Sequence, residues 1–168
     1  VLCNINASSN LAHVIAGRRT LDQVIIDAPG GFQMIAGASG LSQVAALGEY
    51  ERTQLLDQLH QLEQQMDLVI IDTGAGVSPN ILTFAVGADQ LLVVTTPEPT
   101  AITDAYALMK TVHRQRQDMD VCLLVNMARD INEGKAVYDR VQAVCARVLQ
   151  VPVRYAGHVA HDPRVALA

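Results

Sequence analysis

The chain has 168 residues, of which 50% are apolar and 4% aromatic, and its formal charge is −5 with a pI near 5.4. This length fits one domain with a sizeable core, which must be aliphatic because the chain has no Trp and few other aromatic residues. An acidic chain whose only lysines are Lys110 and Lys135 does not offer the clustered cations that nucleic-acid binding needs, and no apolar run approaches the ~20 residues of a membrane-spanning helix.

The first elements along the chain predict a hairpin and a helix. Residues 24–27 (VIID) and 32–37 (FQMIAG) are short strand-like runs, and the intervening APGG is a turn sequence. Between residues 49 and 65, apolar positions recur three or four apart, which predicts an amphipathic helix. Its inner stripe would consist of Leu55, Leu59, Leu62 and Met66.

The next run, LVII (Leu68 to Ile71), predicts a buried strand that ends at Asp72. A short helix then ends at Gly87, and QLLVVTT predicts another strand. Thr100 is a suitable cap for the helix that follows, whose inner stripe would be Ile102, Ala105, Met109 and Val112.

VCLLVNM predicts a further strand, residues 132–149 a helix, and VRYAGHV the last strand. The helix would be buried through Val137, Val141, Val144 and Val148. Strands and helices that alternate at this spacing predict an α/β fold, a mostly parallel open sheet with helices on both faces. We expect residues 1–168 to form a single domain. Cys3, Cys122 and Cys145 are odd in number, which favours reduced thiols in a cytoplasmic protein.

In such a sheet, ligands bind outside the carboxyl ends of the strands. The segments that follow the apolar runs are therefore candidate site segments: 72–76, 96–99, 126–129 and 160–163.

Asp72, followed by Gly74 and Gly76, allows three interpretations. It could be an ordinary turn carboxylate. It could hold Mg²⁺ while the glycines let backbone N–H groups approach a phosphate. The third interpretation, a dinucleotide site of the G-x-G-x-x-G type, fails because Pro79 stands at the third glycine position.

A resemblance to a known family favours the second interpretation. Residues 68–110 look very like the central region of the MinD/ParA superfamily of P-loop ATPases. The run TTPEPTAITDAYA is particularly similar to the FlhG/FleN branch, which regulates flagellar number and placement. Residues 10–40, NLAHVIAGRRTLDQVIIDAPGGFQMIAGASG, resemble the same branch, so the resemblance covers nearly the whole chain.

The resemblance implies ATP and Mg²⁺ as cofactors. Asp72 matches the switch II aspartate that organises the metal, and Gly74 and Gly76 match the hinge after it. Asn126 matches a residue that hydrogen-bonds the adenine edge. The loop that encloses the base would include Ala160, His161 and Asp162, although relatives usually carry proline in place of Ala160.

Two of these assignments have plain alternatives. Asn126 could cap the following turn, and Asp162 before Pro163 is an ordinary turn pair. The segment Glu133 to Ala136 (EGKA) is not a P-loop, because the upstream glycine and the Ser or Thr that holds Mg²⁺ are absent.

The chain departs from the family at its beginning. It contains no glycine-rich Walker A loop and starts with Val1 rather than Met. We therefore expect residues 1–168 to form a single incomplete MinD/ParA-like ATPase domain, truncated so that the central N-terminal strand is missing. The alternative is a degenerate relative that no longer uses ATP.

The expected function is the nucleotide-binding and switch portion of an ATPase whose ATP-dependent homodimerisation regulates flagellar number or placement. The alternative is a nonhydrolytic interaction module that uses the TPEPTAITDAYA surface. A third possibility, a dinucleotide-dependent oxidoreductase, is disfavoured by Pro79 as above. Expected partners are a second copy and flagellar regulatory or assembly proteins, without nucleic acid. Membrane contact at the inner membrane or cell pole would need segments that these residues do not include.

Overall fold

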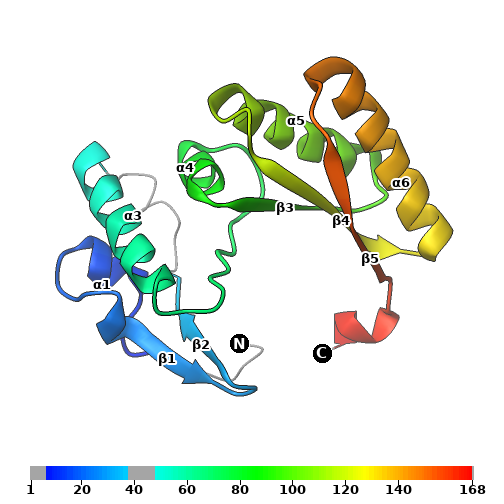
Figure 1. The fold of residues 1–168 in the computed structure, drawn as a ribbon. Helices are drawn as coiled ribbons and strands as arrows, with labels where there is room; N and C mark the ends of the chain where they lie inside the picture. Colours follow the sequence, from blue (N-terminus) through cyan, green and yellow to red (C-terminus); the bar gives the residue numbers. More distant parts are fainter. Residues whose placement is uncertain (1–6, 38–47, 168) are drawn as a thin grey trace. The chain divides into compact units, whose positions relative to one another are not determined.

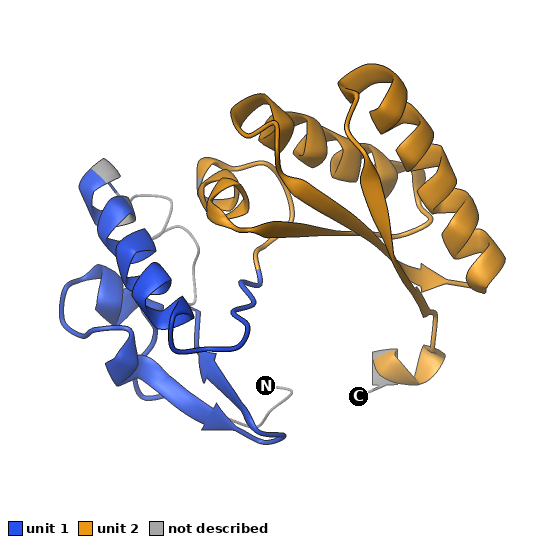
Figure 2. Ribbon diagram, in the orientation of Figure 1, with its two compact units in different colours: residues 1–72 blue, residues 73–168 orange. Residues whose placement is uncertain are grey.

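The computed structural model describes residues 7–37 and 48–167. The chain divides into two compact units, residues 1–72 (unit 1) and residues 73–168 (unit 2), shown in two colours in Figure 2. The boundary falls at Asp72, the residue on which the expected site depends.

Unit 1 contains the predicted hairpin and helix (Figure 1). The strands β1 (Ile25–Ala28) and β2 (Phe32–Ile35) pair antiparallel, so the hairpin is confirmed. Its turn contains Gly30 and Gly31 at φ values of 100° and 83°, which only glycine adopts readily. Unit 1 also contains α1 (Leu11–Ile15), the short 3₁₀ helix η1 (Asp22–Val24) and α3 (Glu49–Glu63).

The core of unit 1 forms where α3 packs its predicted stripe. Leu55 and Leu62 are buried, and Leu59 and Met66 are partly buried. The other buried apolar residues of this unit are Val14, Leu21, Val24 and Ala28. The period of apolar residues in α3 therefore predicted the buried face correctly.

The predicted strand at residues 68–71 is not formed. This segment belongs to neither sheet, and Leu68 and Ile70 are 75% and 81% exposed. A strand is stable only when its N–H and C=O groups pair with a neighbour, and none of the described residues pairs with this segment. The prediction used local sequence alone, which cannot supply that partner.

Unit 2 is a parallel α/β sandwich of one sheet and its helices. Its strands β3 (Gln90–Thr95), β4 (Asp120–Ala128) and β5 (Val153–Ala160) lie in the order β3-β4-β5, and both pairs are parallel. The helices are α4 (Pro79–Gly87), α5 (Pro99–Gln115) and α6 (Ile131–Val144), followed by the π-helical turn η2 (Cys145–Leu149) and the 3₁₀ helix η3 (Pro163–Leu167). The α/β class and parallel sheet are thus confirmed.

The core of unit 2 lies between one face of the sheet and the helices. Leu123 and Val125 of β4 are 0% exposed, and Met109 and Val112 of α5 pack into the same aliphatic layer. On the other face, Leu92 and Val94 of β3 are 52% and 54% exposed. Within unit 2, therefore, the helices cover a single face of the sheet.

Two helix details differ from the prediction. Pro99 is the first residue of α5 and Glu98 its N-cap, so Thr100 lies inside the helix instead of capping it; the fixed φ of proline suits this first position. After α6, the wider π turn shifts the buried stripe, so Val148 is 54% exposed whereas Cys145 is buried.

Two further observations concern the cysteines and the helices. Cys122 and Cys145 are free and buried, while Cys3 lies outside the described residues. No helix in the described ranges combines the length and the apolar character needed to cross a bilayer.

Candidate functional site

The carboxyl ends of β3, β4 and β5 lie at the same edge of the sheet of unit 2, because the strands are parallel. Ala160, the last residue of β5, pairs with Ala128, the last residue of β4. One residue further on, the N–H of His161 donates to the carbonyl oxygen of Ala128 at 2.8 Å. The structure therefore places Asn126 and residues 160–162 on neighbouring strand ends, as the sequence predicted.

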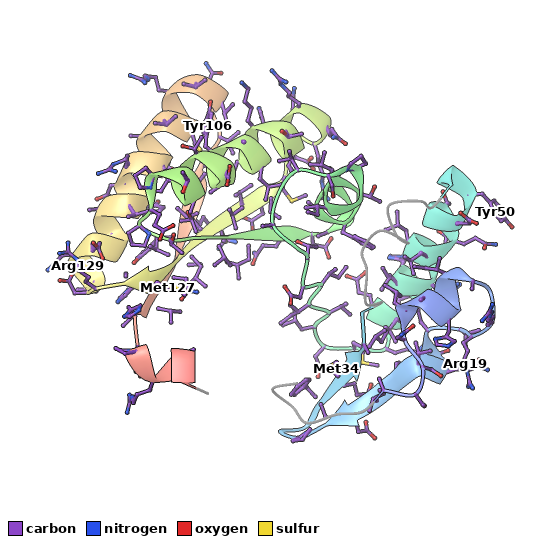
Figure 3. The ribbon with its side chains drawn as sticks, turned by 180° about the vertical axis from the view of Figure 1, so that it is seen from behind. Arg19, Met34, Tyr50, Tyr106, Met127 and Arg129 are labelled. Atoms are coloured by element: carbon purple, nitrogen blue, oxygen red, sulfur yellow. The ribbon has the colours of Figure 1, made fainter. Side chains whose placement is uncertain are left out.

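A β-bulge changes the direction of the β4 backbone at this edge. Val125 pairs with His158 and Ala128 with Ala160, so two residues of β4 oppose one residue of β5. Met127, one of the two bulged residues, has φ of 56°, and its side chain is 55% exposed (Figure 3). Its N–H donates to Oδ1 of Asn126 at 2.9 Å. A left-handed conformation in a bulky residue costs about 1 kcal/mol or more and is typical of functional sites.

Asp162 is held within its own loop. Its carboxylate accepts hydrogen bonds from the backbone N–H of Arg164 at 2.9 Å and from Nη2 of the same arginine at 2.6 Å. These bonds lower the pKa of the Asp162 carboxyl below its ordinary value. The carboxylate therefore stays ionised near neutral pH and fixes the start of η3.

Thr96 lies in the candidate segment 96–99, and it has a polar atom whose lack of a partner the sequence did not predict. Its hydroxyl oxygen is buried and has no hydrogen-bond partner in the described part of the chain. Thr96 follows Thr95, which pairs with Val125, so the orphan hydroxyl lies at the carboxyl edge beside the position of Asn126. An unpaired buried hydroxyl is costly, so its hydrogen-bond partner is expected to come from outside the chain, as a water molecule or a ligand.

The N-terminus of α6 at this edge is already capped. The carboxylate of Asp130 accepts hydrogen bonds from the N–H groups of Asn132 and Glu133 at 2.8 and 2.9 Å. The bond from Glu133 is the main cause of the lowered pKa of Asp130. The negative charge of Asp130 at this N-terminus would repel a phosphate. The EGKA segment lies inside α6, so it does not form a phosphate-binding loop.

The segment that carries Asp72 has no regular structure. Asp72, Gly74 and Gly76 are all exposed, and Gly76 has φ of 109°, which a residue with a Cβ rarely adopts. The Asp72 carboxylate has no hydrogen bond or ion pair to any described residue.

Asp72 is the carboxylate that the sequence analysis assigned to Mg²⁺. The described residues contain no cluster of three or more His, Cys, Asp or Glu side chains that could enclose a metal. Mg²⁺ bound with nucleotide usually takes one or two carboxylates and completes its shell with water and phosphate oxygens. A single accessible carboxylate at Asp72 fits that donor set.

Comparison of the sequence with known proteins gives related sequences but no matching family model. The chain is 32% identical over 165 residues to the antiactivator FleN of Pseudomonas aeruginosa, covering 98% of this chain and 59% of FleN. It is 28% identical over 160 residues to the flagellum site-determining protein YlxH of Helicobacter pylori, covering 95% of this chain and 54% of YlxH. The chain thus spans somewhat more than half the length of these relatives.

Solved structures give the same fold. The cell division ATPase MinD of Pyrococcus furiosus matches with a TM-score of 0.72 at 18% identity, covering 96% of this chain and 64% of that one. A ParA family ATPase from Chlorobium tepidum matches with a TM-score of 0.72 at 17% identity, covering 98% and 67%. At this level of identity the match concerns the fold.

Proposed function

We propose that this chain belongs to the FlhG/FleN-like branch of the MinD/ParA superfamily, because FleN and YlxH are its relatives and MinD shares its fold. On this proposal it is the nucleotide-binding and switch portion of an ATPase that regulates flagellar number or placement. The proposal rests on the edge of the unit 2 sheet at which β3, β4 and β5 have their carboxyl ends. There the bulge at Asn126, the loop after β5 and the orphan hydroxyl of Thr96 lie on neighbouring strand ends. On this proposal, residues 1–168 belong to one incomplete ATPase domain that contains both units.

The adenine base would be bound at this edge. The side-chain amide of Asn126 has both donor and acceptor atoms, which suits the edge of a purine. Its Oδ1 is used by the N–H of Met127, and this bond holds the amide in place. Ala160, His161 and Asp162 would enclose the base from the next strand, with their loop held by the bond between His161 and Ala128.

The segment at residues 72–76 would sense the terminal phosphate of the bound nucleotide. When bound, Mg²⁺ neutralises phosphate charge and orients water for attack at the terminal phosphate. Asp72 would hold that ion, directly or through water. Gly74 and Gly76 would allow the segment to change conformation when the terminal phosphate is lost, which is the general logic of a nucleotide switch.

The output of the switch would be assembly. We propose that ATP binding drives homodimerisation and that the dimer contacts flagellar regulatory or assembly proteins. The protein would act in the cytoplasm, with transient contact at the inner membrane or cell pole.

The complete product of the gene that encodes these residues provides the test. We expect it to bind a fluorescent ATP analogue in a Mg²⁺-dependent manner and to elute as a dimer with ATP. Asp72→Asn should lower its ATP hydrolysis by about 100-fold or more, since a metal-organising group is removed. Asp57→Asn, which changes an exposed carboxylate on α3, is the matched control and should leave hydrolysis unchanged.

Two outcomes decide against this proposal. A complete product that dimerises without binding ATP would be the nonhydrolytic interaction module instead. Equal hydrolysis in the Asp72 and Asp57 variants would remove Asp72 from the switch. Deleting the gene in its host tests the flagellar part, because the number or position of flagella per cell should change.

A further inference from the structure

Unit 1 contains a cleft that the proposed ATPase function does not use. It lies between α3 and the loop that follows α1 and has a volume of about 310 Å³. Most of its wall is polar, with two arginines and three glutamines. The lining residues are Val14, Ile15, Gly17, Arg18, Arg19, Thr20, Gln23, Glu51, Gln54, Leu55 and Gln58.

The charge of the cleft is opposite to that of its surroundings. Residues 1–72 contain eight Asp or Glu residues, no lysine and three arginines, of which Arg18 and Arg19 line the cleft. Neither guanidinium forms an ion pair with a described side chain. Figure 3 shows Arg19 on the loop after α1. Two adjacent guanidiniums without partners favour an anionic ligand, and their planar donors match carboxylates.

The backbone that carries these arginines is fixed. Gly17 has φ of 66° and ends α1, and the N–H groups of Arg18 and Arg19 both donate to the carbonyl oxygen of His13, at 2.9 and 3.2 Å. From the opposite wall, Oε1 of Gln58 accepts a hydrogen bond from the N–H of Leu21 at 3.3 Å. The loop is thus tied at both ends, which lowers the entropy cost of binding.

The other wall of the cleft suits a peptide more than a small anion. Gln54 and Gln58 line this wall with amide groups. Nε2 of Gln54 and Oε1 of Gln58 already form hydrogen bonds within the chain, and Oε1 of Gln54 and Nε2 of Gln58 can pair with the N–H and C=O groups of a peptide backbone. Tyr50, one turn before Gln54 on α3, is 73% exposed, and its hydroxyl accepts a hydrogen bond from Nε2 of Gln54 at 2.7 Å. Exposed tyrosine and arginine are the residue types most enriched at protein-binding hot spots.

Glu51 makes the two sides of the cleft differ in charge. Its carboxylate accepts a hydrogen bond from the N–H of Gly48 at 2.7 Å and so stays on the α3 side. The arginines stand on the loop side, at residues 18 and 19. A bound acidic segment would therefore place its carboxylates toward the loop and its uncharged residues toward Tyr50 and α3.

We propose that this cleft binds an acidic peptide segment of a protein partner. Carboxylates of the segment contact Arg18 and Arg19, its backbone pairs with the glutamine amides, and an apolar side chain packs on Tyr50. This interaction is independent of nucleotide binding.

The test uses the 168-residue chain and a fluorescein-labelled dodecapeptide made of two Glu-Leu-Glu-Glu-Leu-Gly repeats. Fluorescence anisotropy at 50 mM salt should detect binding, and a peptide with Gln in place of Glu should bind at least about tenfold more weakly. Replacing both arginines, Arg18→Gln with Arg19→Gln, should weaken binding of the acidic peptide about tenfold or more. Tyr50→Ala should weaken it about threefold without changing its salt dependence.

The matched control is Arg114→Gln with Arg147→Gln, which removes the same charge from exposed positions in unit 2. If the two double variants bind the acidic peptide with equal affinity, the proposal is wrong. It is also wrong if the unsubstituted chain does not bind the acidic peptide, or if it binds the neutral peptide equally well. Displacement of the peptide by inorganic pyrophosphate at equal concentration would show a phosphate site instead. If the double glutamine variant is unfolded by circular dichroism, Arg18→Lys with Arg19→Lys replaces it. The double lysine variant keeps the positive charges but lacks the planar guanidinium groups, so it should still bind the acidic peptide more weakly than the control variant.

Discussion

A methyl group placed on Gly134 would lie 2.7 Å from Cβ of His158 and 3.1 Å from the hydroxyl oxygen of Tyr155. Gly134 is a buried residue of α6, and both neighbours belong to β5. The hydroxyl of Tyr155 lies 3.3 Å from Nδ1 of His158, so the two side chains form one layer beneath the helix. The absence of a side chain at Gly134 is therefore what allows α6 to approach the strand that leads to residues 160–162.

Gly134→Ala should destabilise the chain despite the higher helix propensity of alanine. The propensity gain is about 1 kcal/mol, whereas overpacking against a Cβ that cannot rotate away costs about 1–3 kcal/mol. We expect a net loss of about 1 kcal/mol, measured as a lower urea midpoint with an unchanged m-value. Lys135→Ala, at the exposed neighbouring position, is the control. A midpoint for Gly134→Ala at or above that of the unsubstituted chain would show that α6 can move away freely.

Leu123→Ala and Leu92→Ala test which face of the unit 2 sheet is the core. Leu123 is 0% exposed, and its truncation should cost about 2–5 kcal/mol in unfolding free energy. Leu92 is 52% exposed on the opposite face, so the same truncation should cost less than about 1 kcal/mol. Chemical denaturation of both variants compares them directly. Equal losses would mean that another element covers the face that carries Leu92.

The elements that could be predicted are those whose signals are local. In α3 and α5 the apolar period alone gives the buried stripe, and in the hairpin the glycines of the turn give its position. The strand expected at residues 68–71 has an equally apolar sequence, yet Leu68 and Ile70 are exposed because strand formation also requires a paired neighbour. That requirement is not local, so sequence alone could not decide it.

The candidate site was predictable to the same extent. The parallel order of strands is enough to bring Asn126 and Ala160 to one edge, and this follows from the alternation of strands and helices. The bulge at Met127 and the orphan hydroxyl of Thr96 were missed. A methionine gives no signal for a positive φ, and a threonine at a strand end gives none for an unpaired hydroxyl.

Acid should weaken unit 2 partly through Asp120. Nε of Arg154 donates to its carboxylate at 2.9 Å and Nε2 of Gln90 at 2.8 Å, and the hydrogen bond from Arg154 is the main cause that lowers the pKa of Asp120 below 3.8. Because the unfolded chain binds a proton more readily here, stability is present above about pH 4 and is lost as the pH falls toward the folded pKa.

The urea midpoint at pH 5 and at pH 3 measures this contribution. Asp120→Asn should show a smaller loss between the two pH values than the unsubstituted chain. Asp139→Asn, an exposed change on α6, should show the full loss. If both variants lose the same amount as the unsubstituted chain, the pairing of Asp120 with Arg154 makes no difference between the folded and unfolded states.

The 168-residue chain by itself should bind Mg-ATP more weakly than about 1 mM, which corresponds to about −4 kcal/mol. Tight phosphate binding needs a nest of backbone N–H groups and a lysine, and these residues contain no Walker A sequence that would form one. The N-terminus of α6 cannot substitute, because Asp130 already occupies its N–H groups. A titration with a fluorescent ATP analogue measures this affinity, with the complete gene product as the positive control. Micromolar affinity in the 168-residue chain would mean that the segment at residues 72–76 and the carboxyl edge suffice to hold the phosphates without such a loop.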